Sequence, residues 1–227
     1  MRPFLRLLSL CLPLLATPAW AEQIFFADQN GRLGYNDNAS GEMIMVGQMP
    51  QAMTDIAFTP DGEFYGITAD AIYRINPETA ETQLIGEHGI PNADGLTAGP
   101  KGRLFAVSSS EEWLYRLDTQ DGYSEEIESF EIRSGGGLMW TMAGFLLADE
   151  NADIVHMSPV HDMPSTYYGE ETGLSKIDAL EMTEFGILGA VGTVIYKIDF
   201  HSRKGPVWEV LDLSENFDAI WGMSTRP

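Results

Sequence analysis

The chain has 227 residues, and its 34 Asp and Glu side chains outnumber its 13 Lys and Arg side chains to give a formal net charge of −21 at pH 7. Such a surface repels the phosphates of nucleic acid and anionic lipid, which excludes nucleic-acid binding and favours cations or basic proteins as partners. The single cysteine, Cys11, lies in the N-terminal leader, so a disulfide framework and a thiolate metal site are excluded as well.

The first 21 residues have the pattern of a cleavable signal peptide. Two arginines come before an apolar run at 7–16, and small residues surround Trp20 as in a cleavage site. The apolar run is too short to anchor the chain in a bilayer, so we expect no membrane insertion. The sequence therefore predicts cleavage after Ala21, a location in a periplasm or outside the cell, and a single domain over residues 22–227.

Residues 54–86 contain four short apolar runs separated by turns. The runs are Ile56–Phe58, Glu63–Ile67, Ala71–Ile75 and Thr82–Ile85, and Pro, Asp, Asn and Gly lie between them. Short runs of β-branched and aromatic residues bounded by such turn formers are typical of strands and hairpins. This stretch predicts one antiparallel sheet of four strands.

The same pattern recurs along the rest of the chain with a period of about 41 residues. An apolar residue opens successive units at spacings of 40, 42, 42 and 40, at positions Ile56, Leu96, Leu138, Leu180 and Ile220. Four strands per unit at this period predict an all-β, five-bladed β-propeller.

The two ends of the chain are expected to share one blade. The first unit begins directly at its second strand, Ile24–Ala27, and the last residues hold an orphan first strand, Ala219–Met223. If these segments pair, five complete blades of four antiparallel strands result, and two exposed sheet edges are avoided. The sequence therefore predicts a ring closed by the C-terminal strand, which joins the N-terminal blade.

The repeat resembles the exported bacterial β-propellers of the YVTN, NHL and gluconolactonase-like group. Those repeats read roughly D-hydrophobic-x-x-x-P-D-G-x-hydrophobic-Y-G, and this chain reads TDIAFTPDGEFYG from Thr54 onward. The resemblance covers nearly all of the chain after the leader. It implies propeller blades, and its motifs do not specify an activity.

Aspartates recur where the first strand of a blade begins. Asp94, Asp178 and Asp218 hold equivalent positions in three blades, and Asp55 lies one place further on in another, so we expect them around the axis. Converging carboxylates suit a hard cation such as Ca²⁺. Alternatively, each Asp accepts hydrogen bonds from backbone N–H groups at the start of its own strand. The sequence leaves both a calcium site and a structural ring open.

Further candidate binding residues belong to loops that should lie at the same mouth of the channel. They are Asp149, Glu150 and Asp153, with His88 and His161 nearby. His161 belongs to an insertion that departs from the repeat, and function is often added at such departures. The alternative is a loop insertion that the fold tolerates.

The first blade carries four closely spaced methionines, Met43, Met45, Met49 and Met53. Thioethers are soft ligands that suit Cu(I), which is one interpretation of the group. Methionine also fills irregular gaps between sheets, which is the other interpretation.

No G-x-S-x-G, HExxH, P-loop or dinucleotide-binding motif occurs in the sequence. We therefore expect a monomeric, exported and non-enzymatic propeller that binds a small ligand or a basic exported protein at an acidic mouth. The alternative function is a hydrolase or lactonase that works with a divalent cation in the same central pocket.

Overall fold

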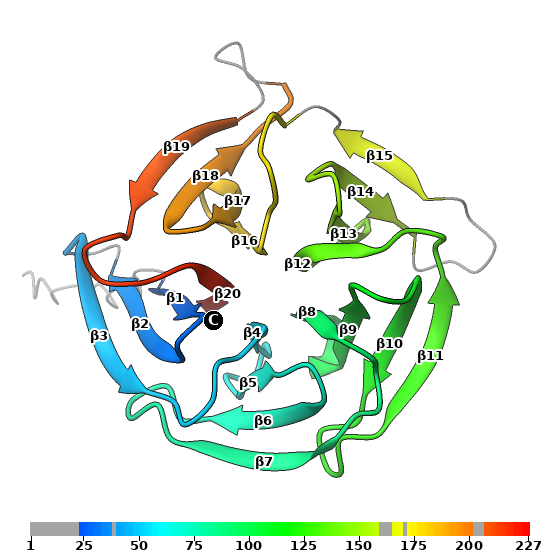
Figure 1. Cartoon of the computed structure of the whole chain (residues 1–227), viewed down its shortest axis with the longest axis horizontal. Helices are drawn as coiled ribbons and strands as arrows, with labels where there is room; N and C mark the ends of the chain where they lie inside the picture. Colours follow the sequence, from blue (N-terminus) through cyan, green and yellow to red (C-terminus); the bar gives the residue numbers. More distant parts are fainter. Residues whose placement is uncertain (1–22, 38–39, 159–164, 170–171, 202–206) are drawn as a thin grey trace, which may run out of the picture.

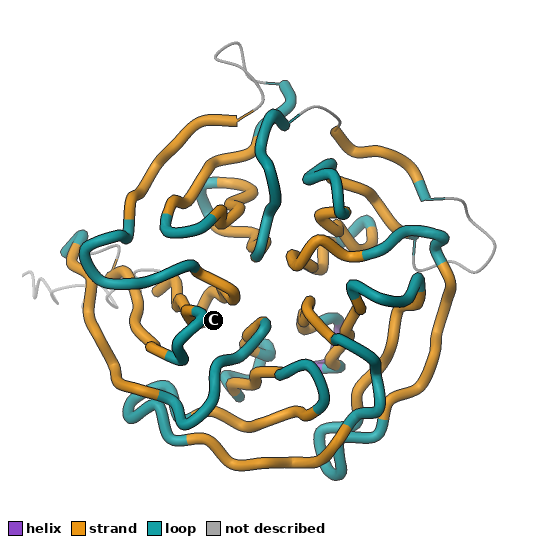
Figure 2. Tube along the Cα trace, in the orientation of Figure 1, coloured by secondary structure: helices purple, strands orange, loops and turns teal. Residues whose placement is uncertain are grey.

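Five four-stranded antiparallel sheets surround a central axis (Figure 1). The computed structural model describes residues 23–37, 40–158, 165–169, 172–201 and 207–227. Strands joined by loops make up these residues apart from one 3-10 turn at Pro100–Gly102 (Figure 2). The predicted five-bladed β-propeller is confirmed, whereas the predicted signal peptide lies outside the described residues. The described part of the chain contains no apolar helix of membrane-spanning length.

Each blade has an inner, a second, a third and an outer strand. The inner strands are β20 (Ile220–Arg226), β4 (Asp55–Phe58), β8 (Ala93–Ala98), β12 (Ser134–Thr141) and β16 (Ala179–Thr183). The second strands are β1 (Gln23–Asp28), β5 (Phe64–Ile67), β9 (Leu104–Ser108), β13 (Gly144–Asp149) and β17 (Gly186–Val191). The third strands are β2 (Arg32–Asp37), β6 (Ala71–Ile75), β10 (Trp113–Leu117), β14 (Ile154–Met157) and β18 (Val194–Ile198). The outer strands are β3 (Glu42–Gln48), β7 (Thr82–Glu87), β11 (Ser124–Ser129), β15 (Thr166–Gly169) and β19 (Val207–Asp212). We number the blades in this order, so that blade 1 contains β20 and β1.

Blade 1 contains both ends of the propeller chain. Its strand order is β20-β1-β2-β3, and β20 runs antiparallel to β1 with Gln23 opposite Arg226 and Phe26 opposite Met223. The predicted closure is therefore confirmed. Pairing with β20 covers the edge of β1, which would otherwise be exposed and would invite association with other chains.

The inner strands of neighbouring blades contact one another around the axis. Glycine permits this close approach at two positions. A Cβ on Gly222 would lie 2.9 Å from the backbone nitrogen of Ile56 in the next blade. Gly136 has a φ of +133°, and a Cβ there would lie 2.8 Å from the carbonyl oxygen of Asp178. Any larger residue at these positions would push two blades apart.

Side chains of inner strands also accept hydrogen bonds from the backbone of the adjacent blade. Ser224 Oγ accepts from the Phe58 N–H at 2.9 Å, and Thr97 Oγ1 accepts from the Trp140 N–H at 3.0 Å. These bonds join inner strands that belong to different sheets. They fix the position of one blade on the next, because each buried N–H needs an acceptor.

Five clusters of buried apolar side chains fill the spaces between neighbouring blades. Met49 and Met53 are buried in the cluster between blades 1 and 2, whereas Met43 packs against the cluster between blades 1 and 5. Met45 is 41% exposed. The four methionines are thus divided between two packing regions and the surface, which favours gap filling over a shared copper site.

Candidate ligand pocket at the channel mouth

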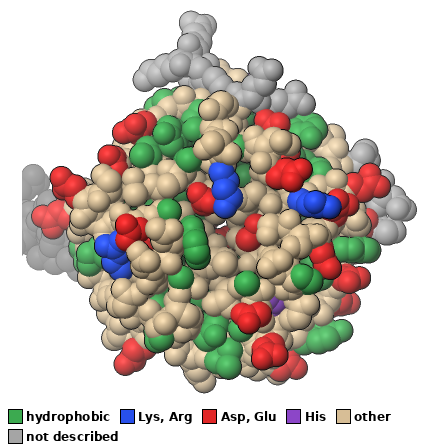
Figure 3. Space-filling model, viewed as in Figure 1, with side chains coloured by type: hydrophobic (Ala, Val, Ile, Leu, Met, Phe, Trp, Pro, Cys, Tyr) green, Lys and Arg blue, Asp and Glu red, His purple; other side chains and the backbone are tan. Residues whose placement is uncertain are grey.

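One end of the central channel opens into a cavity of about 460 Å³ that all five blades line. The lining residues are Trp221 from blade 1, Thr54 from blade 2, Asp94 and Ser109 from blade 3, Ser134, Gly135, Gly136 and Glu150 from blade 4, and Ser175, Lys176 and Asp178 from blade 5. Most of them lie where an inner strand begins. Figure 3 shows acidic side chains spread over one face of the ring and a Lys or Arg side chain close to its centre.

Asp94 contributes to this pocket a carboxyl group with one buried, unpaired oxygen. Its Oδ1 is buried and has no hydrogen-bond partner among the described residues. Burial raises the pKa of Asp94 to about 7, although a hydrogen bond with Ser134 and the charge of Lys176 oppose the rise. Near neutral pH this carboxyl is therefore close to half ionised, and one oxygen can still accept a hydrogen bond.

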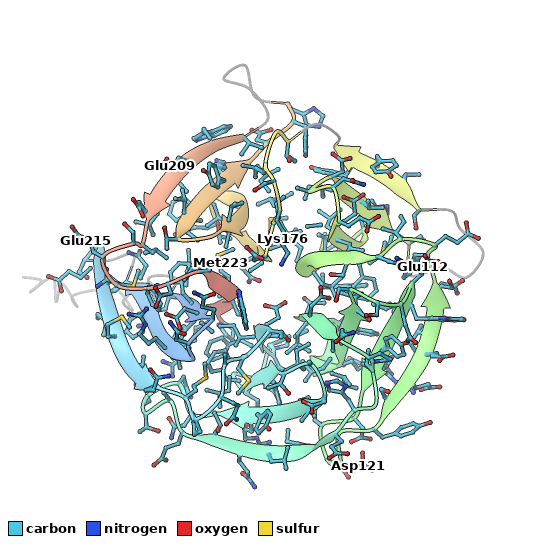
Figure 4. All side chains as sticks on the ribbon, in the orientation of Figure 1. Glu112, Asp121, Lys176, Glu209, Glu215 and Met223 are labelled. Carbon is cyan, nitrogen blue, oxygen red and sulfur yellow. The ribbon has the colours of Figure 1, made fainter. Side chains whose placement is uncertain are left out.

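Lys176 brings a positive charge to the same pocket. Its Nζ lies 2.6 Å from Oδ1 of Asp178, whose side chain is 13% exposed. Figure 4 shows the labelled Lys176 near the axis, in contrast to Asp121 and Glu209 at the periphery. The ion pair compensates the charge of Asp178 directly, whereas Asp94 has no ion pair among the described residues. The two aspartates that sequence reasoning placed together therefore differ in their partners.

Asp55 is a structural residue of the inner strands. It is 2% exposed, and its two oxygens accept hydrogen bonds from the N–H of Ile56 at 2.8 Å and the N–H of Leu96 at 2.7 Å. Burial raises the pKa of Asp55 well above its usual range, and the two backbone hydrogen bonds oppose the rise. Because Leu96 belongs to the next blade, Asp55 links blades 2 and 3, as the structural alternative predicted.

Asp218 lies in a polar cluster at the closure of blade 1. Its side chain is 49% exposed, accepts a hydrogen bond from Asn30 Nδ2 at 2.5 Å and forms an ion pair with Arg32.

The register of β1 on β20 shifts at Asp28, and Trp221 is the extra residue of the bulge. Bulges redirect side chains. As a result, Trp221 lines the pocket from blade 1.

The predicted calcium site at Asp55, Asp94, Asp178 and Asp218 stays a prediction. Among the described residues, no group of three or more His, Cys, Asp or Glu side chains is placed to hold a metal ion. Asp94 and Asp178 share one cavity, whereas Asp55 and Asp218 have the partners given above. A calcium ion there would compete with Lys176 for Asp178.

The candidates at the end of β13 and on the loop after it have different roles. Asp149 is 3% exposed, and its Oδ1 accepts from the N–H of Asn151 at 2.8 Å and the N–H of Asp153 at 2.9 Å. It therefore shapes a turn. Asp28 makes the same two contacts in the turn after β1. Asp153 is partly buried, and Glu150 is exposed and lines the pocket.

His88 is buried in the connection after β7. Its Nδ1 accepts a hydrogen bond from the Ile90 N–H at 3.1 Å, so Nε2 carries the proton and donates to the Thr68 carbonyl at 3.2 Å. Burial lowers the pKa of His88. Both ring nitrogens are used by the backbone, which is a structural arrangement. His161 lies outside the described residues.

Sequence reasoning missed Lys176, Ser134 and Trp221 as members of the pocket. Lys176 lies two residues before Asp178, and Ser134 is the first residue of β12, so a wider window around each strand start would have included both. The position of Trp221 depends on the bulge in β20. No sequence pattern indicated this bulge, because it appears only when β20 is paired with β1.

Neither a protein-family model nor a curated protein matches the chain. Among solved structures, the chain is similar to one in a crystal structure of a nidogen/laminin complex, with a TM-score of 0.62 and 12% identity over 91% of this chain and 98% of that chain. It is also similar to a structural genomics protein of unknown function from Bacteroides thetaiotaomicron, with a TM-score of 0.61 and 13% identity over 89% of this chain and 61% of that one. A third structure, of a protein of unknown function from Bacteroides caccae, has a TM-score of 0.56 and 11% identity over 91% and 99% of the two chains. These identities show a shared propeller fold alone.

Proposed function

We propose that the protein is an exported, non-enzymatic binding propeller whose channel-mouth pocket takes a small ligand with a cationic nitrogen. The observation that carries this proposal is Oδ1 of Asp94, a buried carboxyl oxygen that lines the pocket without a hydrogen-bond donor among the described residues. Buried polar atoms are normally paired, and an unpaired one in a cavity is a candidate contact for a ligand.

The charges of the pocket favour a cation. Asp94, Glu150 and Asp178 contribute carboxyl groups, and Lys176 is the basic residue among the lining side chains. An ammonium group beside Asp94 would supply the missing hydrogen bond and would favour the ionised carboxylate. Trp221 offers an aromatic surface on which a cation also gains attraction.

The size of the pocket favours a small ligand. About 460 Å³ lies within the range of sites that bind small molecules and is too small for a folded protein domain. Ser109, Ser134 and Ser175 add hydroxyl groups that can orient polar parts of the ligand.

The proposal is tested with cadaverine, a linear diamine, against the neutral isostere 1,5-pentanediol in isothermal titration calorimetry. Cadaverine should bind and the diol should bind at least about tenfold more weakly, because one charged hydrogen bond is worth roughly one decade in affinity. Asp94→Asn should lose most of the cadaverine affinity. Asp121→Asn, at the periphery of the ring, removes the same charge and should bind as the wild type.

The raised pKa of Asp94 adds a pH test. Affinity for cadaverine should fall as pH is lowered from about 8 to about 6, because Asp94 becomes protonated through a pKa of about 7. Equal binding of the diamine and the diol, or full affinity in Asp94→Asn, would overturn the proposal. A separate titration with CaCl₂, followed by the melting temperature, tests the divalent-cation alternative. A rise in melting temperature with Ca²⁺ but not with cadaverine would favour the divalent-cation alternative.

A further inference from the structure

A second cavity, of about 480 Å³, lies between blades 3 and 4. Pro100 and Arg103 follow the end of β8, whereas Asp94 lies at its start, so this cavity opens at the opposite end of the inner strands from the channel-mouth pocket. We call it the aromatic pocket. Its function is independent of the ligand proposed above.

Aromatic rings form the floor of the aromatic pocket. Phe145 is 2% exposed, and Phe105 and Trp140 pack edge-on against it with ring centroids 5.0 and 4.7 Å away. Phe105 and Trp140 are only partly buried, so parts of their surfaces face the cavity. A flat or branched apolar group placed there would remove aromatic surface from water.

The rim of the aromatic pocket carries two arginines where another blade has an ion pair. In blade 2, Arg74 Nε lies 3.1 Å from Oε2 of Glu63. Arg116 holds the position of Arg74 in blade 3, and Arg103 holds the position of Glu63. Blade 3 therefore has a second arginine, Arg103, where blade 2 has the acidic member of its ion pair.

Arg103 is the arginine that is open to a ligand. Arg116 pairs with Glu125 on the outer strand, whereas the Arg103 side chain has no ion pair or hydrogen bond among the described residues. Lys101, on the same turn, lies with both arginines around the adjoining hollow. Three carboxylates, Asp118, Glu125 and Glu128, line the same two hollows, so the charge there is balanced rather than negative as on the chain as a whole. The attraction for an anion therefore comes from Arg103 itself, whose guanidinium has hydrogen-bond donors beside the apolar floor.

We infer that the aromatic pocket binds an amphipathic anion, a molecule with an aromatic or branched apolar body and a carboxylate. The apolar body lies on Phe105, Trp140 and Phe145. The carboxylate pairs with Arg103, whose planar guanidinium can donate two parallel hydrogen bonds. An apolar floor with few placed polar groups is the usual construction of a small-molecule site.

The test uses 4-phenylbutyrate and the neutral 4-phenyl-1-butanol, which share the same apolar body, in isothermal titration calorimetry. The acid should bind the wild type about tenfold more tightly than the alcohol, and added NaCl should reduce the difference. Arg103→Glu restores the Glu–Arg pattern of blade 2. This variant should lose the preference for the acid and keep the weak binding of the alcohol.

Lys101→Glu is the matched control. It makes the same change in net charge on the same turn, but Lys101 does not line the aromatic pocket, so most of the preference for the acid should remain. Arg103→Glu should melt no lower than the wild type, because the introduced carboxylate can pair with Arg116 as Glu63 pairs with Arg74. If Arg103→Glu is unstable, Arg103→Gln replaces it. Equal affinity of the wild type for acid and alcohol, or a preference that survives both Arg103 variants, would overturn the inference.

Discussion

The inner and outer strands of the ring differ in burial, in their contacts with neighbouring blades and in charge. All four residues of β4 are buried, whereas β11 has no buried residue and β7 has none either. Inner strands contact each other around the axis through glycines and through hydrogen bonds between blades, and outer strands carry exposed carboxylates. The difference indicates that the stability of the ring resides near its axis, whereas its outer wall determines charge and solubility.

The largest expected effect comes from removing an inner strand. Deletion of residues 217–227 removes β20 and leaves the edge of β1 unpaired. We expect loss of the cooperative folded state, with aggregation, measured by circular dichroism and size-exclusion chromatography. Deletion of Pro227 alone, which follows β20, is the control. A deletion protein that melts as the full chain does would show that closure is unimportant.

Two leucines, one on an inner strand and one on an outer strand, test the comparison at single residues. Leu96 in β8 is 1% exposed and Leu84 in β7 is 56% exposed. Leu96→Ala should lower the free energy of unfolding by about 2–5 kcal/mol because it leaves a cavity. Leu84→Ala should change it by less than about 0.5 kcal/mol. Urea unfolding gives both values, and equal costs at the two positions would contradict the assignment of stability to the axis.

Asp55→Ala tests the polar link between two inner strands. The change removes the acceptor for the N–H groups of Ile56 and Leu96. We expect a loss of about 2 kcal/mol, since each buried unpaired donor costs about 1–3 kcal/mol and removal of a buried carboxyl recovers part of the loss. The urea midpoint should fall with little change in slope. A variant as stable as the wild type would mean that Asp55 does not stabilise the contact between the blades.

Asp94→Asn should change the free energy of unfolding less than Asp55→Ala does, and it should stabilise the protein rather than destabilise it. The pKa of Asp94 is raised to about 7 in the folded protein, so its contribution to stability is complete below the unfolded pKa of about 4 and is lost as pH rises through 7. The amide of the variant does not ionise, so the stability of the variant does not fall over this pH range for this reason. Relative to wild type it should gain about 1–2 kcal/mol between about pH 4 and pH 8, once solvent screening is allowed for. A difference that stays constant across this range in urea unfolding would contradict the raised pKa.

The fold could be predicted from the sequence because blade period and turn chemistry are local. Pro60-Asp61-Gly62 marks a hairpin wherever it stands, and the missing first strand of blade 1 indicated the closure. The candidate site was harder to predict. Asp55 and Asp94 look alike in the repeat, but the partners that separate them come from another blade. Asp218 differs again because Asp28 pairs with Ile220 as Ala190 pairs with Ala179 in blade 5, so Ala219 rather than Asp218 stands where Asp178 does.

Closure by the last strand also governs the order of assembly. β1 is made first and keeps an open edge until β20 has been made, so the ring cannot be complete before β20 has been synthesised. During this interval β20 of a second copy can fill the edge as well as the chain's own β20 can. Domain-swapped dimers are therefore the misassembled form that this architecture favours at high protein concentration.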